Sequence, residues 1–384
     1  MEIYYGHPSQ QKLVGNIYKG RVEDVLPGLG SAFVDVGEQK SLFLSQGEIN
    51  DTILKKHGFK PWHGSAPISK VVRPGENVVL QVRRAGIGSK NPQGTTKISI
   101  PGRFWVYLPT EDRLAVSRRI ESVRSQRCLR RMARELKTDG EGMIARTAAQ
   151  VAGDEDLKRD YEFLRSVWSG VEGAARSSSA PQLLYKAMGL VQSILRDRLL
   201  PDVEEVVVDS PFFFEKIGSF LGYMHMGAYA DRIRVHKEKK SLFDHYEIEK
   251  QIQATLARRV DLDAGGFIVI DETEALTAID VNTGADVQHR NQQAAILNTN
   301  LEAAREIARQ LRLRQISGII VVDFVDMETP GAVQKVCDSL RKELTKDRVS
   351  ADLIDVTGLG LVEITRKRSG ESLAGMLENA DFEA

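Results

Sequence analysis

Two apolar stretches, residues 273–284 (TEALTAIDVNTG) and residues 318–327 (GIIVVDFVDM), decide the fold of the last third of the chain. Each contains an apolar run of strand length that reaches an aspartate, Asp280 in the first and Asp323 in the second. The second run is too apolar for an exposed strand, so we expect a buried one. Residues 293–314 lie between the two and show the spacing of an amphipathic helix. A strand, a helix and a strand in succession predict an α/β region.

The two aspartates are the first candidates for chemistry. A carboxylate at the end of a buried strand is costly unless a cation meets it, and strand ends form the usual ligand crevice of α/β sheets. Asn282 points to the same side of an extended chain as Asp280, whereas Asp326 faces the opposite way from Asp323. Two carboxylates and an amide suit Mg²⁺, which binds few protein ligands. The spacing fits strand-end caps or surface ion pairs equally well.

The first third of the chain is predicted to form short strands. Residues 14–36 alternate apolar and polar side chains around a Pro-Gly turn, and residues 41–45 and 77–85 continue the pattern. Such spacing predicts a small β-barrel. Alternation places Phe33 on the face opposite Ala32 and Val34, and exposed aromatic side chains there would stack on nucleic-acid bases. The alternative is that these rings close the core of the barrel.

The middle of the chain is less regular. Residues 118–134 hold seven arginines and one glutamate, a pattern typical of a solvated helix face and equally suited to binding phosphates. Residues 182–200 have the apolar stripe of a helix that Pro201 ends. From residue 203 strands and helices alternate, which again favours an α/β arrangement.

Composition limits the classes of protein that the chain can be. Its 384 residues suggest two to three domains, and 42% hydrophobic and 28% charged residues are typical of globular proteins. The 53 basic and 53 acidic residues cancel, so any nucleic-acid surface must be local. The sequence contains no nucleotide-binding P-loop, no G-x-S-x-G and no H-E-x-x-H. The two cysteines are far apart and offer no zinc spacing, and we expect a cytoplasmic protein without a membrane segment.

Several motifs together closely resemble the catalytic core of the bacterial ribonuclease E/G family. They are GNIYKGRVEDVLPGLGSAFVDVGE, SRRIES, GMIARTA, TEALTAIDVNTG, NTNLEAAREIARQLRLRQISGIIVVDFVDM and GLGLVEITRKR. The resemblance covers nearly the whole chain, and the pair TEALTAIDVNTG and IIVVDFVDM in this order is very specific.

The resemblance implies a mixed α+β and α/β multidomain fold. It begins with an S1-like OB-fold barrel over residues 12–92 and a 5′-sensor region over residues 93–190. An incomplete RNase H-like subdomain would combine residues 1–11 and 191–255, and residues 256–384 would form a DNase I-like catalytic subdomain. The implied activity is Mg²⁺-dependent endonucleolytic cleavage of single-stranded, often A/U-rich RNA to 5′-phosphate and 3′-hydroxyl ends, with Mn²⁺ as the alternative metal. It implies a role in RNA processing and mRNA decay.

The matching motifs also assign roles to residues. Asp280 and Asp323 correspond to the metal ligands, and Asn282 to the residue that orients the scissile phosphate. The residues that would grip RNA in the barrel are Phe33, Phe43 and Lys90. Those that would read a 5′-monophosphate are Gly102, Val106, Arg146 and Thr147.

Three departures from the family pattern shape further expectations. The chain lacks the opening strand of the RNase H-like part, and it ends before the family's zinc-binding C-x-x-C motif and small domain. We therefore expect no zinc in this chain and a monomer or a weak homodimer. Ser350 stands where an arginine supporting the 5′ pocket is expected, so the 5′-phosphate preference should be weak. A non-catalytic RNA-binding protein is the alternative function, although it does not account for the two aspartates.

Overall fold

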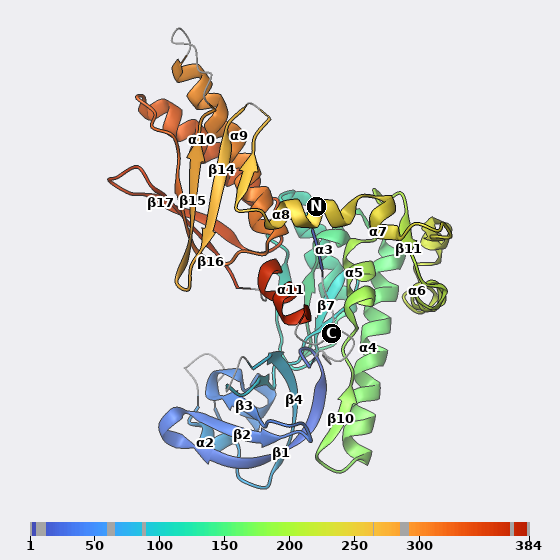
Figure 1. Ribbon diagram of the computed structural model, residues 1–384. Coiled ribbons are helices and arrows are strands. Elements are labelled where there is room, and N and C mark those ends of the chain that lie inside the picture. The colour runs from blue at the N-terminus through green and yellow to red at the C-terminus, as the bar shows by residue number, and fades with distance from the viewer. Residues whose placement is uncertain are drawn as a thin grey trace. The chain divides into compact units, whose positions relative to one another are not determined.

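A computed structural model describes residues 2–4, 13–59, 66–86, 90–263, 265–284, 292–368 and 372–381. Contacts divide the chain into two compact units (Figure 1). One combines residues 1–7 with residues 237–384, and the other comprises residues 8–236.

The unit of residues 8–236 begins with a closed five-stranded barrel of the OB-fold type. Its strands are β1 (Ile17–Leu26), β2 (Ser31–Asp35), β3 (Leu42–Ser45), β4 (Asn77–Arg84) and β5 (Gln93–Thr95). They pair in the order β1-β2-β3-β5-β4, and a further β1–β4 pairing closes the barrel. The interior is filled by apolar side chains that alternate along the strands, among them Val34, Leu42, Leu44 and Leu80. This confirms the barrel predicted from alternation.

A four-stranded sheet follows the barrel in the same unit. The strands β6 (Ile100–Pro101), β7 (Trp105–Leu108), β9 (Gly142–Ala145) and β8 (Leu114–Val116) lie in that order. The helices α3 (Val123–Leu136) and α4 (Asp154–Ser177) share the core of this sheet. Most of the arginine-rich segment of residues 118–134 forms α3, which begins at Val123, buries Leu129 and Ala133 and leaves its arginines exposed.

A third, smaller core completes this unit. It contains α5 (Leu190–Arg198), α6 (Pro211–Tyr223) and the parallel pair β11 (Val206–Val208) and β12 (Ile233–Val235). The single helix predicted over residues 182–200 is wrong at its start. Residues Gln182–Tyr185 form β10, which pairs with the first residues of β1, and α5 begins only at Leu190. The free edge of β1 supplies backbone partners that outweigh the helical pattern.

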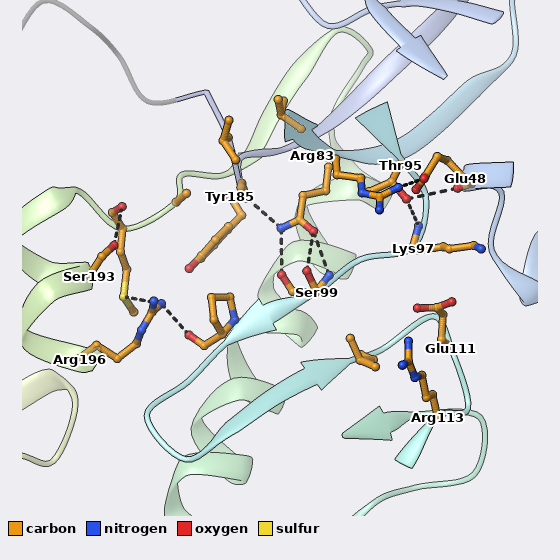
Figure 2. Close-up of a pocket in the computed structure, with 18 residues that line it drawn as sticks. Glu48, Arg83, Thr95, Lys97, Ser99, Glu111, Arg113, Tyr185, Ser193 and Arg196 are labelled. Atoms are coloured by element: carbon orange, nitrogen blue, oxygen red, sulfur yellow. Dashed lines mark hydrogen bonds and ion pairs between the residues drawn. The ribbon is translucent and has the colours of Figure 1, made fainter. Parts of the chain in front are cut away.

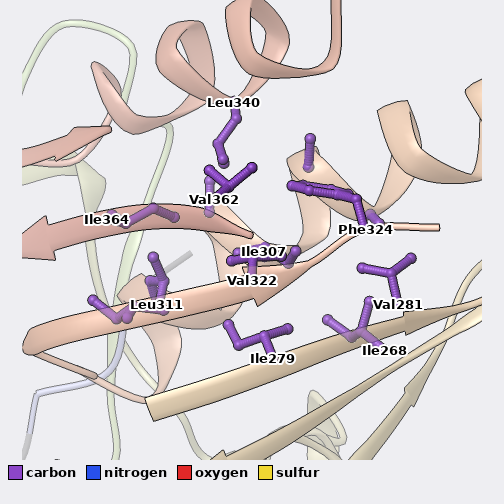
Figure 3. Close-up of a cluster of buried hydrophobic side chains, with 14 of the residues drawn as sticks. Ile268, Ile279, Val281, Ile307, Leu311, Val322, Phe324, Leu340, Val362 and Ile364 are labelled. Atoms are coloured by element: carbon purple, nitrogen blue, oxygen red, sulfur yellow. The ribbon is translucent and has the colours of Figure 1, made fainter. Parts of the chain in front are cut away.

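The other unit is built on an open six-stranded sheet covered on one face by two helices. Its strands are β13 (Arg259–Asp261), β14 (Phe267–Glu272), β15 (Leu276–Asn282), β16 (Gly318–Asp323), β18 (Val362–Arg366) and β17 (Ala351–Val356), in that order. Only the β15–β16 pairing is parallel, and α9 (Gln292–Leu313) connects these two strands. The helices α9 and α10 (Pro330–Leu344) pack on the sheet through a continuous apolar core (Figure 3).

The second face of this sheet is not buried within the unit. Ile320 and Val322 of β16 lie in the core, whereas Ile319 is 57% exposed and Asp323 is exposed. The expectation that residues 318–323 form a fully buried strand is therefore wrong. Among the described residues of this unit, helices cover one side of the sheet, so β16 presents alternate residues to solvent despite its apolar sequence.

The short helices α7 (Leu242–His245) and α8 (Ile248–Leu256) precede this sheet, and α11 (Leu373–Asp381) follows it. In the part of the chain that the structure describes, helices long and apolar enough to cross a membrane are absent.

Candidate functional site

The two predicted metal ligands lie side by side on the open sheet. In the parallel ladder of β15 and β16, Asp280 pairs in register with Asp323. Both are exposed, and the residues that flank them in the strands, Ile279, Val281 and Val322, point into the core. Because neighbouring strands are about 4.8 Å apart, in-register residues project their side chains from the same face at close range. The sheet thus brings together two carboxylates that lie far apart in the sequence, on either side of α9.

Asn282 joins this pair. Its Nδ2 donates a hydrogen bond of 2.8 Å to Oδ2 of Asp280, which fixes one oxygen of that carboxylate. The side-chain carbonyl oxygen of Asn282 takes no part in this hydrogen bond and can act as an acceptor. The strand alternation that predicted Asn282 on the side of Asp280 is confirmed.

These groups suit a hard divalent cation. Within the described ranges, groups of three or more His, Cys, Asp or Glu side chains placed to hold a metal are absent. Mg²⁺ nevertheless keeps several waters and binds proteins through one or two carboxylates. The exposed carboxylates of Asp280 and Asp323 therefore fit such an ion.

Asp326 is not part of the β16 strand. The strand ends at Asp323, and residues 324–327 have no regular structure. Alternation therefore does not determine the direction of Asp326, although its side chain is exposed like that of Asp323.

The predicted aromatic platform lies on the outer face of the barrel. Phe33 of β2 and Phe43 of β3 are register partners whose rings meet edge to face, with centroids 5.9 Å apart. Both side chains are half-buried, and their strand neighbours Ala32, Val34 and Leu44 fill the interior. The alternative that these rings close the barrel core is therefore excluded by the structure.

Lys90 lies near Phe43 because the residues that follow it, Asn91 and Pro92, are hydrogen-bonded to the segment of β3. Phe43 donates its backbone N–H to the carbonyl of Pro92, and Asn91 donates to the carbonyl of Ser41. Lys90 itself is exposed. Lys19, by contrast, donates from its Nζ to the carbonyls of Ala175 and Ser178 at 2.7 Å each, so it caps the C-terminal end of α4.

The predicted 5′-phosphate residues come together at one end of the β7–β9 pair. Arg146 donates from Nη1 to the carbonyl of Gly102 at 2.5 Å. Val106 pairs with Ile144, and Thr147 lies 3.1 Å from Ser117, measured between hydroxyl oxygens. The structure thus places all four predicted residues on one short stretch of sheet and loop.

The Gly102 loop is held by a carboxylate that the sequence did not point out. Asp160 of α4 accepts backbone N–H groups from Arg103, Phe104 and Trp105 at 2.8–3.0 Å. A Cβ on Gly102 would lie 2.7 Å from the Asp160 oxygens, so this position requires glycine. The sequence offers no signal for this contact, because the acceptor lies in the middle of a distant helix.

Asp197 is a second residue that sequence reasoning missed. Its Oδ1 lies 2.7 Å from Nη2 of Arg146, and Arg196 binds the same carboxylate from its Nε. Burial opposes ionisation of Asp197, but the hydrogen bonds from Arg196 and the charge of Arg146 outweigh it and lower its pKa. The cation proposed to meet a terminal phosphate is therefore already paired with an anion.

A cavity of about 610 Å³ lies in the same unit, lined by residues of the barrel, the four-stranded sheet and α5 (Figure 2). It carries both charges. Arg83 pairs with Glu48 on the barrel side of the cavity. Lys97 and Arg113 line the cavity near Glu111. Arg196 reaches it from α5, which links the cavity to the Arg146–Asp197 pair.

Comparison with known proteins places the chain in one family. The model of the ribonuclease E/G family matches residues 99–369. Ribonuclease G of Haemophilus influenzae is 38% identical over 377 residues, which cover 98% of this chain and 77% of that protein. Ribonuclease G of Escherichia coli K12 is 38% identical over 379 residues with the same coverage, and ribonuclease E of Nostoc sp. PCC 7120 is 37% identical over 366 residues, or 94% of this chain and 52% of that protein. The chain belongs to the ribonuclease E/G family.

Proposed function

We propose that this protein is a metal-dependent endoribonuclease of RNA processing and mRNA decay that hydrolyses single-stranded, A/U-rich RNA and leaves 5′-phosphate and 3′-hydroxyl ends. The observation that carries the proposal is the in-register pairing of Asp280 with Asp323 on an exposed sheet face, in a chain that aligns with ribonucleases G along nearly its whole length.

The chemistry of the site supports hydrolysis of a phosphodiester. A bound Mg²⁺ or Mn²⁺ would activate a water molecule and neutralise charge on the reacting phosphate. Asp280 and Asp323 provide the anionic oxygens that hold such an ion. Asn282 orients the Asp280 carboxylate and can contact the scissile phosphate from the same face.

The other predicted residues would bind the substrate. Phe33 and Phe43 offer ring faces and edges to unpaired bases, and Lys90 offers a charge to the backbone. A terminal phosphate would be received by Arg146 and Thr147, with Gly102 and Val106 shaping the pocket.

We propose the four-part division of the chain on the same basis. The barrel strands β1–β4 lie within residues 12–92 and the barrel strand β5 follows at residues 93–95, just beyond that range. The sheet of β6–β9 lies within residues 93–190, and the open sheet lies within residues 256–384. An incomplete RNase H-like part would combine residues 191–255 with residues 1–11, of which the structure describes only residues 2–4.

A cleavage assay tests the proposed activity. A 5′-labelled single-stranded RNA rich in A and U is incubated with the protein in Mg²⁺, in Mn²⁺ and in EDTA. We expect the protein to cleave the RNA internally only when Mg²⁺ or Mn²⁺ is present. We also expect a downstream product that a kinase labels only after phosphatase treatment. Binding without cleavage in either metal would identify a non-catalytic RNA-binding protein, and cleavage in EDTA would refute the metal site.

A further inference from the structure

The open face of the six-stranded sheet carries more than the two aspartates. The ladder registers align Arg259 of β13 with Val269 of β14, and Val269 with Asp280, so these residues form one row that ends at Asp323. In the next row Phe267 pairs with Asn282. The intervening residues of β14, Ile268 and Ile270, are buried in the core. Phe267 and Val269 therefore project from the same face as the carboxylates.

Arg259 and Phe267 form a built pair on this face. The guanidinium carbon of Arg259 lies 3.8 Å from the centroid of the Phe267 ring. Asp261 binds Nε and Nη2 of the same guanidinium at 2.8 Å, which fixes its plane. The Arg259 side chain is still 60% exposed. One side of the guanidinium thus faces the ring, and its other side and its remaining N–H donors are open to a ligand.

We infer that the Arg259–Phe267 pair is a nucleotide-binding subsite for the residue of single-stranded RNA that flanks the scissile phosphate. Strands lie about 4.8 Å apart, which places Phe267 one strand from Asn282 and Arg259 about 10 Å from Asp280 along the sheet. The RNA base stacks on the open side of the guanidinium, which Phe267 supports from beneath, as bases stack on arginine planes in single-strand recognition. The inference rests on the proposed function, because it takes Asp280 and Asp323 as the cleavage site.

The neighbouring arginine shows why this pair is singled out. Arg258 is also exposed, but both its Nε and Nη2 donate to Asp271, at 2.5 and 2.7 Å. Asp271 pairs with Ala278. This row lies next to the row of Val269 and Asp280, on the side opposite to the row of Phe267 and Asn282. Arg258 therefore has the same charge and a similar exposure without the aromatic support.

The test compares Arg259→Met with Arg258→Met, which removes the same charge from the same strand edge, and with Phe267→Leu, which keeps apolar volume without the ring. The intact protein is assayed on a single-site RNA and on versions of it with one abasic nucleotide beside the cleaved bond. We expect Arg259→Met and Phe267→Leu to lower kcat/KM by about fivefold to a hundredfold, and Arg258→Met by less than about twofold.

The abasic substrates give a readout that a structural role would not move. For the wild type, kcat/KM on one of the abasic RNAs should be lower than on the intact RNA by about the factor that Arg259→Met loses on the intact RNA. For Arg259→Met, kcat/KM should be the same on the two RNAs. Equal rates in the two arginine variants, or an abasic cost that Arg259→Met retains, would overturn the subsite.

Binding of the same RNAs in EDTA, followed by fluorescence anisotropy, separates this inference from the proposed function. We expect weaker binding by Arg259→Met than by Arg258→Met without any cleavage. Equal affinities would contradict the subsite alone. Full activity of Asp280→Asn would contradict the cleavage site and, with it, the position of the subsite beside the scissile phosphate, whereas the affinities in EDTA would still decide whether the Arg259–Phe267 pair binds RNA.

Discussion

The barrel and the six-stranded sheet use the same alternation of side chains to opposite effect. The barrel closes on itself through the β1–β4 pairing and fills its interior, so its candidate binding residues, Phe33 and Phe43, lie outside. The sheet is open and covered by helices on one face, so its other face carries Asp280 and Asp323. The aromatic pair joins antiparallel strands that are neighbours in sequence, whereas the carboxylate pair joins parallel strands on either side of α9. Closure leaves an aromatic pair on the outside of the barrel, and the open sheet has a face on which distant segments meet.

The largest effect that we expect concerns what holds the open sheet together. Arg366, the last residue of β18, donates to Asp347 and to the carbonyl of Ile316, and both side chains of this ion pair are 4% exposed. Asp347→Ala leaves a buried cation without its anion and should lower the free energy of unfolding by about 3–5 kcal/mol.

Urea unfolding with hydrogen exchange of β18 peptides measures this change. The control is Asp338→Ala, which breaks an exposed pair with Arg341 and should cost no more than about 1 kcal/mol. Equal effects of the two substitutions would show that the buried pair does not hold the sheet.

The next effect tests the outer face of the barrel. Phe33→Ala and Phe43→Ala should each weaken RNA binding by roughly 1–3 kcal/mol, because each removes a stacking surface. Fluorescence anisotropy with a labelled oligonucleotide gives the affinity, and a melting curve gives the stability.

Leu44→Ala on the inner face is the contrasting variant. It should lower the free energy of unfolding by about 2–5 kcal/mol and leave the affinity per folded molecule unchanged. If the phenylalanine variants melt early and bind normally, the rings serve packing and the contrast between the two faces fails.

The smallest effect concerns the 5′ end of the RNA. Since Asp197 already neutralises Arg146, we expect less than about a tenfold rate advantage of 5′-monophosphate over 5′-hydroxyl RNA. Asp197→Asn should increase this advantage by about fivefold, or roughly 1 kcal/mol, as it frees the guanidinium. Competition between the two substrates measures the ratio, and a smaller advantage in the variant would show that Asp197 positions Arg146.

The lowered pKa of Asp197 also predicts how the stability of the protein depends on pH. The lowered pKa of Asp197 means that its contribution to stability is present above its unfolded pKa, near 3.9, and is lost as the pH falls through the folded value. Wild-type stability should therefore decline on acidification below about pH 4 more than that of Asp197→Asn.

Local alternation predicted much of this molecule, and long-range pairing explains the rest. The outward direction of Phe33 and the shared side of Asp280 and Asn282 follow from a period of two along one strand. The register that sets Asp280 beside Asp323 depends on hydrogen bonds between strands, which no local pattern contains. The edge of β1 likewise turned residues 182–185 from the predicted helix into a strand.

The cleavage rates of Asp280→Asn and Asp323→Asn test the central claim most directly, with Asp326→Asn as the matched control that removes a nearby exposed carboxylate. Loss of a metal ligand removes several kcal/mol of transition-state stabilisation, so single-turnover rates of the first two variants should fall by at least about a hundredfold. Their RNA affinity and the rate of the control should stay close to the wild-type values. More than a tenth of the wild-type rate in both Asp280→Asn and Asp323→Asn would contradict the assignment of this sheet face as the site of cleavage.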